Sequence, residues 1–166
     1  FENIRHAWEV AIQFERLDLI DNSLGGLNMY FDLSFRNDEG LALFEKAAEN
    51  ISDETRQGVR ILSLLTGYLV WLNLSLGNYK QGEKRFRESL TLMHRVEPIQ
   101  TREEKYAQAF HLFLKGIYNR FHGDLSVFKK LFIQSINLFE ELGENWWCER
   151  IYRFLGNAAW TGKMAS

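Results

Sequence analysis

The chain has 166 residues, of which 46% are apolar and 25% are charged, a balance that is typical of a globular domain and excludes a disordered chain. The single proline, Pro98, excludes the collagen-like and proline-rich classes, and a formal net charge of −2 provides no broad electrostatic footprint for nucleic acid. The single cysteine, Cys148, excludes an internal disulfide and fits a reducing compartment, so we expect a cytoplasmic protein in which this thiol packs in the interior.

The first 50 residues contain three segments with apolar residues at helical spacing. They predict helices over residues 3–14, about 18–34 and about 39–50. Gly25 and Gly26 lie inside the second segment, where each glycine costs about 1 kcal/mol relative to alanine on an exposed helix. We therefore expect a neighbouring helix to approach closely at these two glycines.

The middle of the chain holds its least polar stretch, nineteen uncharged residues between Arg60 and Lys80. We expect a long buried helix here, with Ser52 as its N-cap. The stretch is about long enough to cross a bilayer, since roughly 20 residues do so. However, it contains five serine, threonine and asparagine residues and has no strong basic flank. A helix covered on several sides by neighbouring helices is therefore the better interpretation.

Four more helices are predicted in the remainder, over about 79–95, 101–122, 125–142 and 145–160. Thr101 and Glu104 have the spacing of a capping box, Asp124 is a good N-cap, and Gly143 is suited to a left-handed C-terminal residue. No segment shows the alternation of a β-strand. The predicted fold is all-α, with about eight helices arranged as antiparallel hairpins.

The turn regions repeat along the chain. Residues 76–79 and 122–125 are both turns containing glycine, and the residues that follow them match at an offset of 46: Phe86 with Phe132, Ser89 with Ser135, Leu90 with Ile136. The turn at Phe35 precedes Gly77 by 42 residues. A drifting period of about 40 residues with two helices per unit indicates a helical solenoid.

This pattern resembles the tetratricopeptide repeat: a small residue such as Gly116, the turn Gly123-Asp124, and then the Phe132-x-x-Ser135 spacing of the second helix. Tyr79, Phe86 and Ser89 match the same second-helix pattern. Departures are the bulky Phe128 where alanine is usual, Phe35 in place of a turn glycine, and linkers longer than a 34-residue repeat allows. The resemblance implies a right-handed superhelical array of hairpins.

The expected array fills residues 1–166 as a single helical-repeat domain, which comprises a lone helix (3–16), three hairpin units (17–51, 52–97, 98–143) and a truncated unit (144–166). The chain begins at Phe1 without a leader pattern and ends just after Gly162, where another turn is predicted. We therefore expect a piece of a longer protein.

A narrower resemblance involves ENIRHAWEVAI, NMYFDLSFR and DEGLALFEKAAE in the first 50 residues. These segments look like the repeat region of large bacterial multidomain ATPase transcriptional regulators related to the maltose activator, and of some nucleotide cyclases. This resemblance implies a role in signalling or transcription regulation, in which the repeats sense an inducer or a partner and control a nucleotide-binding module.

No pattern for catalysis or metal binding is present. The four histidines include no pair at i, i+4, and the chain has no CxxC, HExxH or GxSxG motif. The glycine-rich segment after Leu76 lacks the Lys-Ser/Thr that a phosphate loop requires, because Glu83 follows its second glycine. We therefore expect no enzymatic activity, no cofactor and no metal.

Aromatic residues, 14% of the chain, provide the candidate binding surface. In the expected register the first helix of each hairpin lines a concave groove that suits an amphipathic helix or a neighbouring domain. The predicted groove residues are Leu64, Trp71, Leu74, Phe110, Phe113, Ile117, Arg120 and Phe121. The alternative for any of these aromatic residues is packing between helices.

The expected partner is a protein or a peptide, including flanking domains of the same protein, and neither nucleic acid nor a membrane is expected to bind this segment. The alternative function is sensing of a small-molecule inducer held by aromatic residues with Arg120 or Arg153. An open groove favours the first function, and a closed pocket with a few convergent polar groups favours the second.

Overall fold

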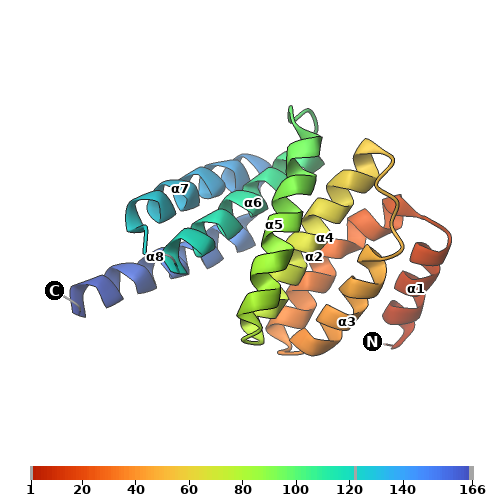
Figure 1. Cartoon of the computed structure of the whole chain (residues 1–166), viewed down its shortest axis with the longest axis horizontal. Coiled ribbons are helices and arrows are strands. Elements are labelled where there is room, and N and C mark those ends of the chain that lie inside the picture. Colours follow the sequence, from red (N-terminus) through yellow and green to blue (C-terminus); the bar gives the residue numbers. More distant parts are fainter. Residues whose placement is uncertain (1, 122, 165–166) are drawn as a thin grey trace. The chain divides into compact units, whose positions relative to one another are not determined.

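A computed structural model describes residues 2–121 and 123–164, with side chains described as far as Asn157. The described residues form eight α-helices and no strand, which confirms the predicted all-α class (Figure 1). The helices are α1 (Glu2–Gln13), α2 (Leu17–Leu33), α3 (Asn37–Ala48), α4 (Arg56–Ser75), α5 (Tyr79–Val96), α6 (Arg102–Phe121), α7 (Leu125–Leu142) and α8 (Asn145–Met164). They form two compact units that meet in sequence at Glu97 and Pro98, and each unit is described by itself.

Helix ends follow local chemistry at most of the predicted positions. The Glu104 backbone N–H donates to Thr101 Oγ1 at 3.2 Å and the Thr101 N–H donates to Glu104 Oε2 at 3.3 Å, which confirms the capping box. The Val127 N–H donates to Asp124 Oδ1 at 3.0 Å, and Gly143 has a left-handed φ of 73°. These ends depend on residues adjacent in sequence, and for this reason the sequence predicts them well.

The start of α4 differs from the prediction. Thr55, not Ser52, is the N-cap, and its Oγ1 accepts from the Gly58 N–H at 3.0 Å. Ser52 lies three residues earlier in an irregular turn, where its Oγ accepts from the Glu54 N–H at 3.3 Å. A β-carbon on Gly58 would lie 2.2 Å from the Ser52 carbonyl oxygen, so this turn folds back tightly onto the new helix.

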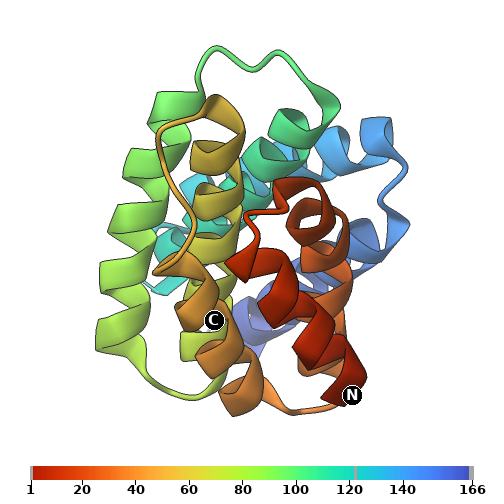
Figure 2. The same cartoon turned by 90° about the vertical axis from the view of Figure 1, so that its right-hand side faces the viewer.

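Unit 1 contains α1 to α5. Helices α2 and α4 run in one direction, and α1, α3 and α5 run in the other (Figures 1 and 2). Two side-chain contacts hold α2 to α4: Arg60 Nη1 donates to Asp21 Oδ1 at 2.8 Å, and Trp71 Nε1 donates to Asp32 Oδ1 at 2.9 Å. Both contacts join residues 39 apart, so the two helices pack in parallel and in a fixed register.

Helix α4 is the central helix of unit 1 and is buried on almost every side, from Gly58 to Asn73. Within the described part of the chain, α4 alone is long enough and apolar enough to cross a membrane. However, 89% of its most apolar window is buried inside the protein. A covered core helix passes the same test of length and composition, so this finding is weak evidence for a membrane span.

Equivalent residues in α4–α5 and α6–α7 make the same contacts 46 positions apart. The guanidinium of Arg56, at the start of α4, donates to the carbonyl of Val96, at the end of α5. In the same way the guanidinium of Arg102, at the start of α6, donates to the carbonyl of Leu142, at the end of α7. The side chains of Asn73 and Asn119 each donate to the carbonyl four residues earlier, both at 2.8 Å. The sequence offset of 46 therefore corresponds to a repeated hairpin geometry.

Unit 2 contains α6, α7 and α8 around an aromatic core. Phe113 packs against Phe132 and Trp147, with ring centroids 5.4 and 5.6 Å apart, and Phe139 stacks on Trp147 at 5.7 Å. Trp147 is buried and donates to the Tyr106 hydroxyl at 2.7 Å, whereas Trp146 is half-buried beneath the Arg150 guanidinium. The two adjacent tryptophans thus differ in burial, as expected of neighbours on one helix.

Close helix approach occurs at Gly116 and Gly40 and not at Gly26, one of the two glycines for which it was predicted. A β-carbon on Gly116 would lie 2.3 Å from Phe132 Cδ1, and one on Gly40 would lie 2.7 Å from Phe31 Cγ. By contrast, a β-carbon on Gly26 would meet no atom within 4 Å, so the expected close neighbour at Gly26 is absent from the described chain. The turn expected at Gly162 is also wrong, because α8 continues to Met164. His122, the expected end of the sixth helix, lies outside the described residues.

Candidate partner-binding surface

Five of the eight predicted groove residues belong to the core. Leu64, Trp71, Phe110, Phe113 and Ile117 are all less than 9% exposed. The Trp71 indole is hydrogen-bonded to Asp32, and the rings of Phe110 and Phe113 pack against Trp147. These side chains offer no surface to a partner, because helices within the same unit cover them.

The other three predicted residues keep some exposure. Leu74 and Arg120 are half-buried, and Phe121 is 66% exposed. The Arg120 guanidinium lies 5.6 Å from the centre of the buried Phe128 ring, a cation–π geometry. The groove assignment stays a prediction for these three residues alone.

The largest exposed apolar side chains gather at hairpin turns. In unit 1 the α2–α3 and α4–α5 turns lie at the same end (Figures 1 and 2), because α2 and α4 run in parallel. These two turns expose Leu33, Phe35, Leu76 and Tyr79, which we call the turn surface of unit 1. In unit 2 the α6–α7 turn exposes Phe121 and Leu125, the latter 46 residues after Tyr79.

Phe35 is the most unusual residue of the turn surface. It is 89% exposed and has a left-handed φ of 57°, a conformation that glycine adopts at the matching turn positions Gly77 (φ 77°) and Gly123 (φ 85°). The turn closes in the same way in each hairpin, with the Arg36 N–H donating to the Phe31 carbonyl at 3.0 Å. A left-handed backbone costs an L-residue about 1–2 kcal/mol. The chain thus keeps a strained, exposed phenylalanine where glycine would fit.

Charges beside the α2–α3 turn are paired within the chain. Arg36 Nε donates to Glu39 Oε1 at 2.6 Å and Arg36 Nη1 donates to the Tyr30 hydroxyl at 2.7 Å. The Glu39 carboxylate raises the pKa of the Arg36 guanidinium, so this side chain stays protonated. Two further exposed charges flank the surface, Asp38 and Lys80, and they have opposite signs. The turn surface is therefore apolar and close to neutral.

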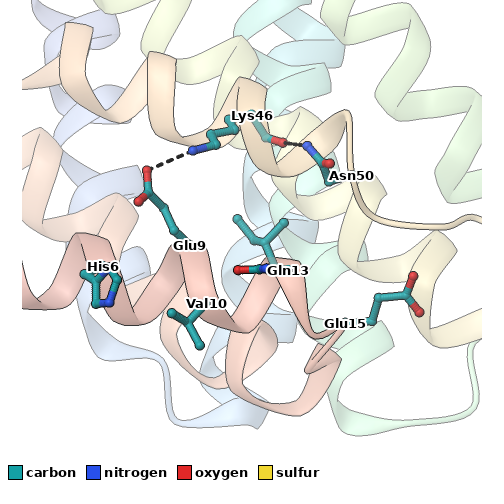
Figure 3. Close-up of a pocket in the computed structure, with 8 residues that line it drawn as sticks. His6, Glu9, Val10, Gln13, Glu15, Lys46 and Asn50 are labelled. Carbon is teal, nitrogen blue, oxygen red and sulfur yellow. Dashed lines mark hydrogen bonds and ion pairs between the residues drawn. The ribbon is translucent and has the colours of Figure 1, made fainter.

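A pocket of about 490 Å³ lies between α1 and α3, on a different side of unit 1 (Figure 3). His6, Glu9 and Gln13 of α1 face Lys46 of α3 and Asn50, which follows α3, across it. Lys46 Nζ donates to Glu9 Oε1 at 3.0 Å, and this hydrogen bond lowers the pKa of Glu9. Its main charged groups thus neutralise each other, and the pocket is an open polar crevice.

Catalytic chemistry is not evident in the part of the chain that the structure describes. No three histidine, cysteine, aspartate or glutamate side chains there cluster so as to hold a metal ion. Cys148 is buried, and burial raises the pKa of its thiol, which disfavours the thiolate that a nucleophile requires. The prediction that the chain is not an enzyme stays a prediction.

Sequence reasoning missed the turn surface because it assigned the binding role to the first helix of each hairpin. One signal was available: Phe35 stands where the repeat pattern calls for glycine. A phenylalanine at that position is unfavourable for the backbone, and a large side chain in a turn is exposed unless another segment covers it.

Comparison with known proteins gives no relative: no family model, no curated protein and no solved structure matches the chain.

Proposed function

We propose that this chain is a non-catalytic helical-repeat domain that binds a protein partner, and that the turn surface of unit 1 contacts this partner. The observation that supports the proposal is Phe35, which is exposed, aromatic and held in a left-handed conformation. Strain of this kind that no internal contact explains is typical of functional positions. Aromatic residues are also enriched at the centres of protein interfaces.

The expected partner surface is apolar and weakly charged. Leu33, Leu76 and Tyr79 add further exposed apolar area at the same end of unit 1 as Phe35, and the neighbouring Arg36 is already paired with Glu39. Asp38 and Lys80, the two exposed charges that flank the surface, have opposite signs, so a strongly acidic or strongly basic partner would meet one repulsive charge for each attractive one. The resemblance to bacterial signalling regulators supports a partner domain within the same regulatory protein.

The test replaces Phe35 by asparagine, which tolerates the left-handed conformation but removes the apolar ring. The matched control is Phe14→Asn, because Phe14 is 67% exposed at the α1–α2 turn, at the opposite end of unit 1 (Figure 1). The chain is used as bait, captured proteins are identified by mass spectrometry, and each is purified for direct titration. We expect Phe35→Asn to weaken binding about tenfold or more and Phe14→Asn to leave it unchanged.

Equal affinity of the wild type and both variants would refute the turn surface as the contact site. If no identified protein binds the wild-type chain directly, the proposed function itself fails. The second candidate function, sensing of a small polar ligand, would then be favoured by the α1–α3 pocket of Figure 3, where polar side chains of both helices converge.

A further inference from the structure

Helix α2 carries an exposed stripe on the side opposite its core contacts. Its core side chains are Ile20, Leu24, Leu27 and Phe31. On the solvent side, residues spaced 3, 4, 3 and 4 apart are all exposed, and we call them the α2 stripe: Leu19, Asn22, Gly26, Met29 and Leu33. A 3–4 spacing is the seam along which two helices pack. Leu19 and Leu33, at its ends, are 47% and 59% exposed.

Gly26 lies at the centre of the α2 stripe and has no packing reason within the described chain. An added β-carbon would meet no atom within 4 Å. At Gly40 and Gly116, by contrast, a phenylalanine ring already occupies the space that a β-carbon would need. Glycine in a helix interior destabilises the helix relative to alanine. A glycine that leaves room on the outer side of a helix allows another helix to approach its backbone from outside.

The carboxylates of α2 lie off the stripe and are engaged elsewhere. Asp18 pairs with Arg16 at 2.8 Å, Asp21 pairs with Arg60, and Asp32 accepts from Trp71. The stripe itself therefore contains no charged side chain. Two identical copies of it can face each other without the like-charge repulsion that disfavours most pairs of identical surfaces.

The order of residues along the stripe fits a two-fold axis at Gly26. Leu19 and Leu33 each lie seven residues from Gly26, on opposite sides, while Asn22 lies four before it and Met29 three after it. If two α2 helices cross antiparallel at Gly26, Leu19 of each copy meets Leu33 of the other, and Asn22 meets Met29. A two-fold interface requires this kind of self-complementarity.

We propose that a second copy of this chain docks on the α2 stripe, so that the two α2 helices cross antiparallel at Gly26. Leu33 belongs to both the α2 stripe and the turn surface of unit 1, whereas Phe35 lies beyond the end of α2 and Gly26 lies only on the stripe, so substitutions of Gly26 and of Phe35 test the two surfaces separately. The full 166-residue chain, of 19.6 kDa, associates into a dimer of twice that mass.

The experiment measures molar mass by sedimentation equilibrium up to about 1 mM, so that even millimolar dissociation constants are detected. Gly26→Leu blocks close approach at an exposed position that tolerates a side chain, and we expect it to raise the dimer dissociation constant about tenfold or more. The matched control is Ile4→Glu, an exposed apolar residue on α1 outside the stripe, which leaves the mass unchanged.

A charge pair tests the antiparallel register. Leu33→Glu alone weakens the dimer, and the double variant Leu19→Lys/Leu33→Glu restores it, because each introduced ammonium then meets a carboxylate of the other copy. Circular dichroism confirms that each variant remains helical. A monomeric wild type over the whole concentration range overturns the proposal, as does a dimer that Gly26→Leu leaves intact. Failure of partner capture by the turn surface would not affect either result.

Discussion

Substitutions of Phe35 separate the backbone strain of the α2–α3 turn from the contribution of its side chain. Because the residue is 89% exposed, its ring contributes only about a tenth of the 1.5–3 kcal/mol that full burial provides, or about 0.2–0.3 kcal/mol. Phe35→Ala keeps the strained φ of 57° and loses this small amount. Phe35→Gly relieves about 1–2 kcal/mol of left-handed strain but loses about 0.5–1 kcal/mol to the greater freedom of glycine in the unfolded chain. The glycine variant should therefore unfold with a free energy about 0.5–1 kcal/mol above that of the alanine variant.

The measurement is urea unfolding followed by circular dichroism, with the same slope required for all variants so that midpoints report stability alone. Gly77→Ala should change the stability in the opposite direction in the equivalent turn. An alanine there must adopt a φ of 77°, and we expect the free energy of unfolding to fall by about 1 kcal/mol. An alanine variant at position 35 that is as stable as the glycine variant would refute the left-handed assignment of Phe35 and the strain argument that supports the proposed function.

Three further substitutions test the packing and the electrostatics. Gly116→Ala should lower the free energy of unfolding in thermal or urea melts, because its β-carbon would lie 2.3 Å from Phe132, and overpacking of about 1–3 kcal/mol exceeds the gain of about 1 kcal/mol in helix propensity; unchanged stability would mean that the ring moves freely. Asn28→Leu should raise the free energy of urea unfolding by about 1–3 kcal/mol, because the fully buried Asn28 amide has no hydrogen-bond partner among the described residues; a loss of stability would show that the amide is satisfied. Asp124→Asn keeps an N-cap without a titrating group. The Val127 N–H lowers the pKa of Asp124 below its ordinary 3.8, so the wild type should lose stability relative to the variant as the pH falls below about 4, measured as the melting temperature from pH 7 to pH 2; parallel profiles would contradict the cap.

The burial of Asn28 depends on the register between α2 and α4, which is set only when the two helices pack side by side. The contacts of Asp21 with Arg60 and of Asp32 with Trp71 share an offset of 39, and the same offset sets Asn28 opposite Gly67. In the sequence, Asn28 is a polar residue directly after Leu27, and nothing in the local pattern marks it as buried. Its burial is a consequence of the parallel packing of α2 and α4, which no local pattern predicts.

The positions and ends of the helices were determined by the sequence, because they depend on neighbours within four residues. Apolar periodicity located all eight helices, and Thr101, Asp124 and Gly143 marked their ends through hydrogen bonds and a left-handed φ that local chemistry dictates. Ser52 failed as a cap because Thr55, three residues later, competes for the same role, and the choice depends on how the preceding turn folds back.

The tertiary structure alone decided which apolar side chains are buried and which remain available to a partner. Helical periodicity shows that Phe110 and Phe113 face something apolar, but a groove partner and a neighbouring helix impose the same pattern. Likewise, Gly26 and Gly116 look alike in sequence, although one faces open space and the other a phenylalanine ring. Burial is a property of distances between segments far apart in the chain. For this reason the open α2 stripe could be recognised only after the helices had been packed, whereas the Phe35 turn had one signal in the sequence, a phenylalanine where the repeat pattern calls for glycine.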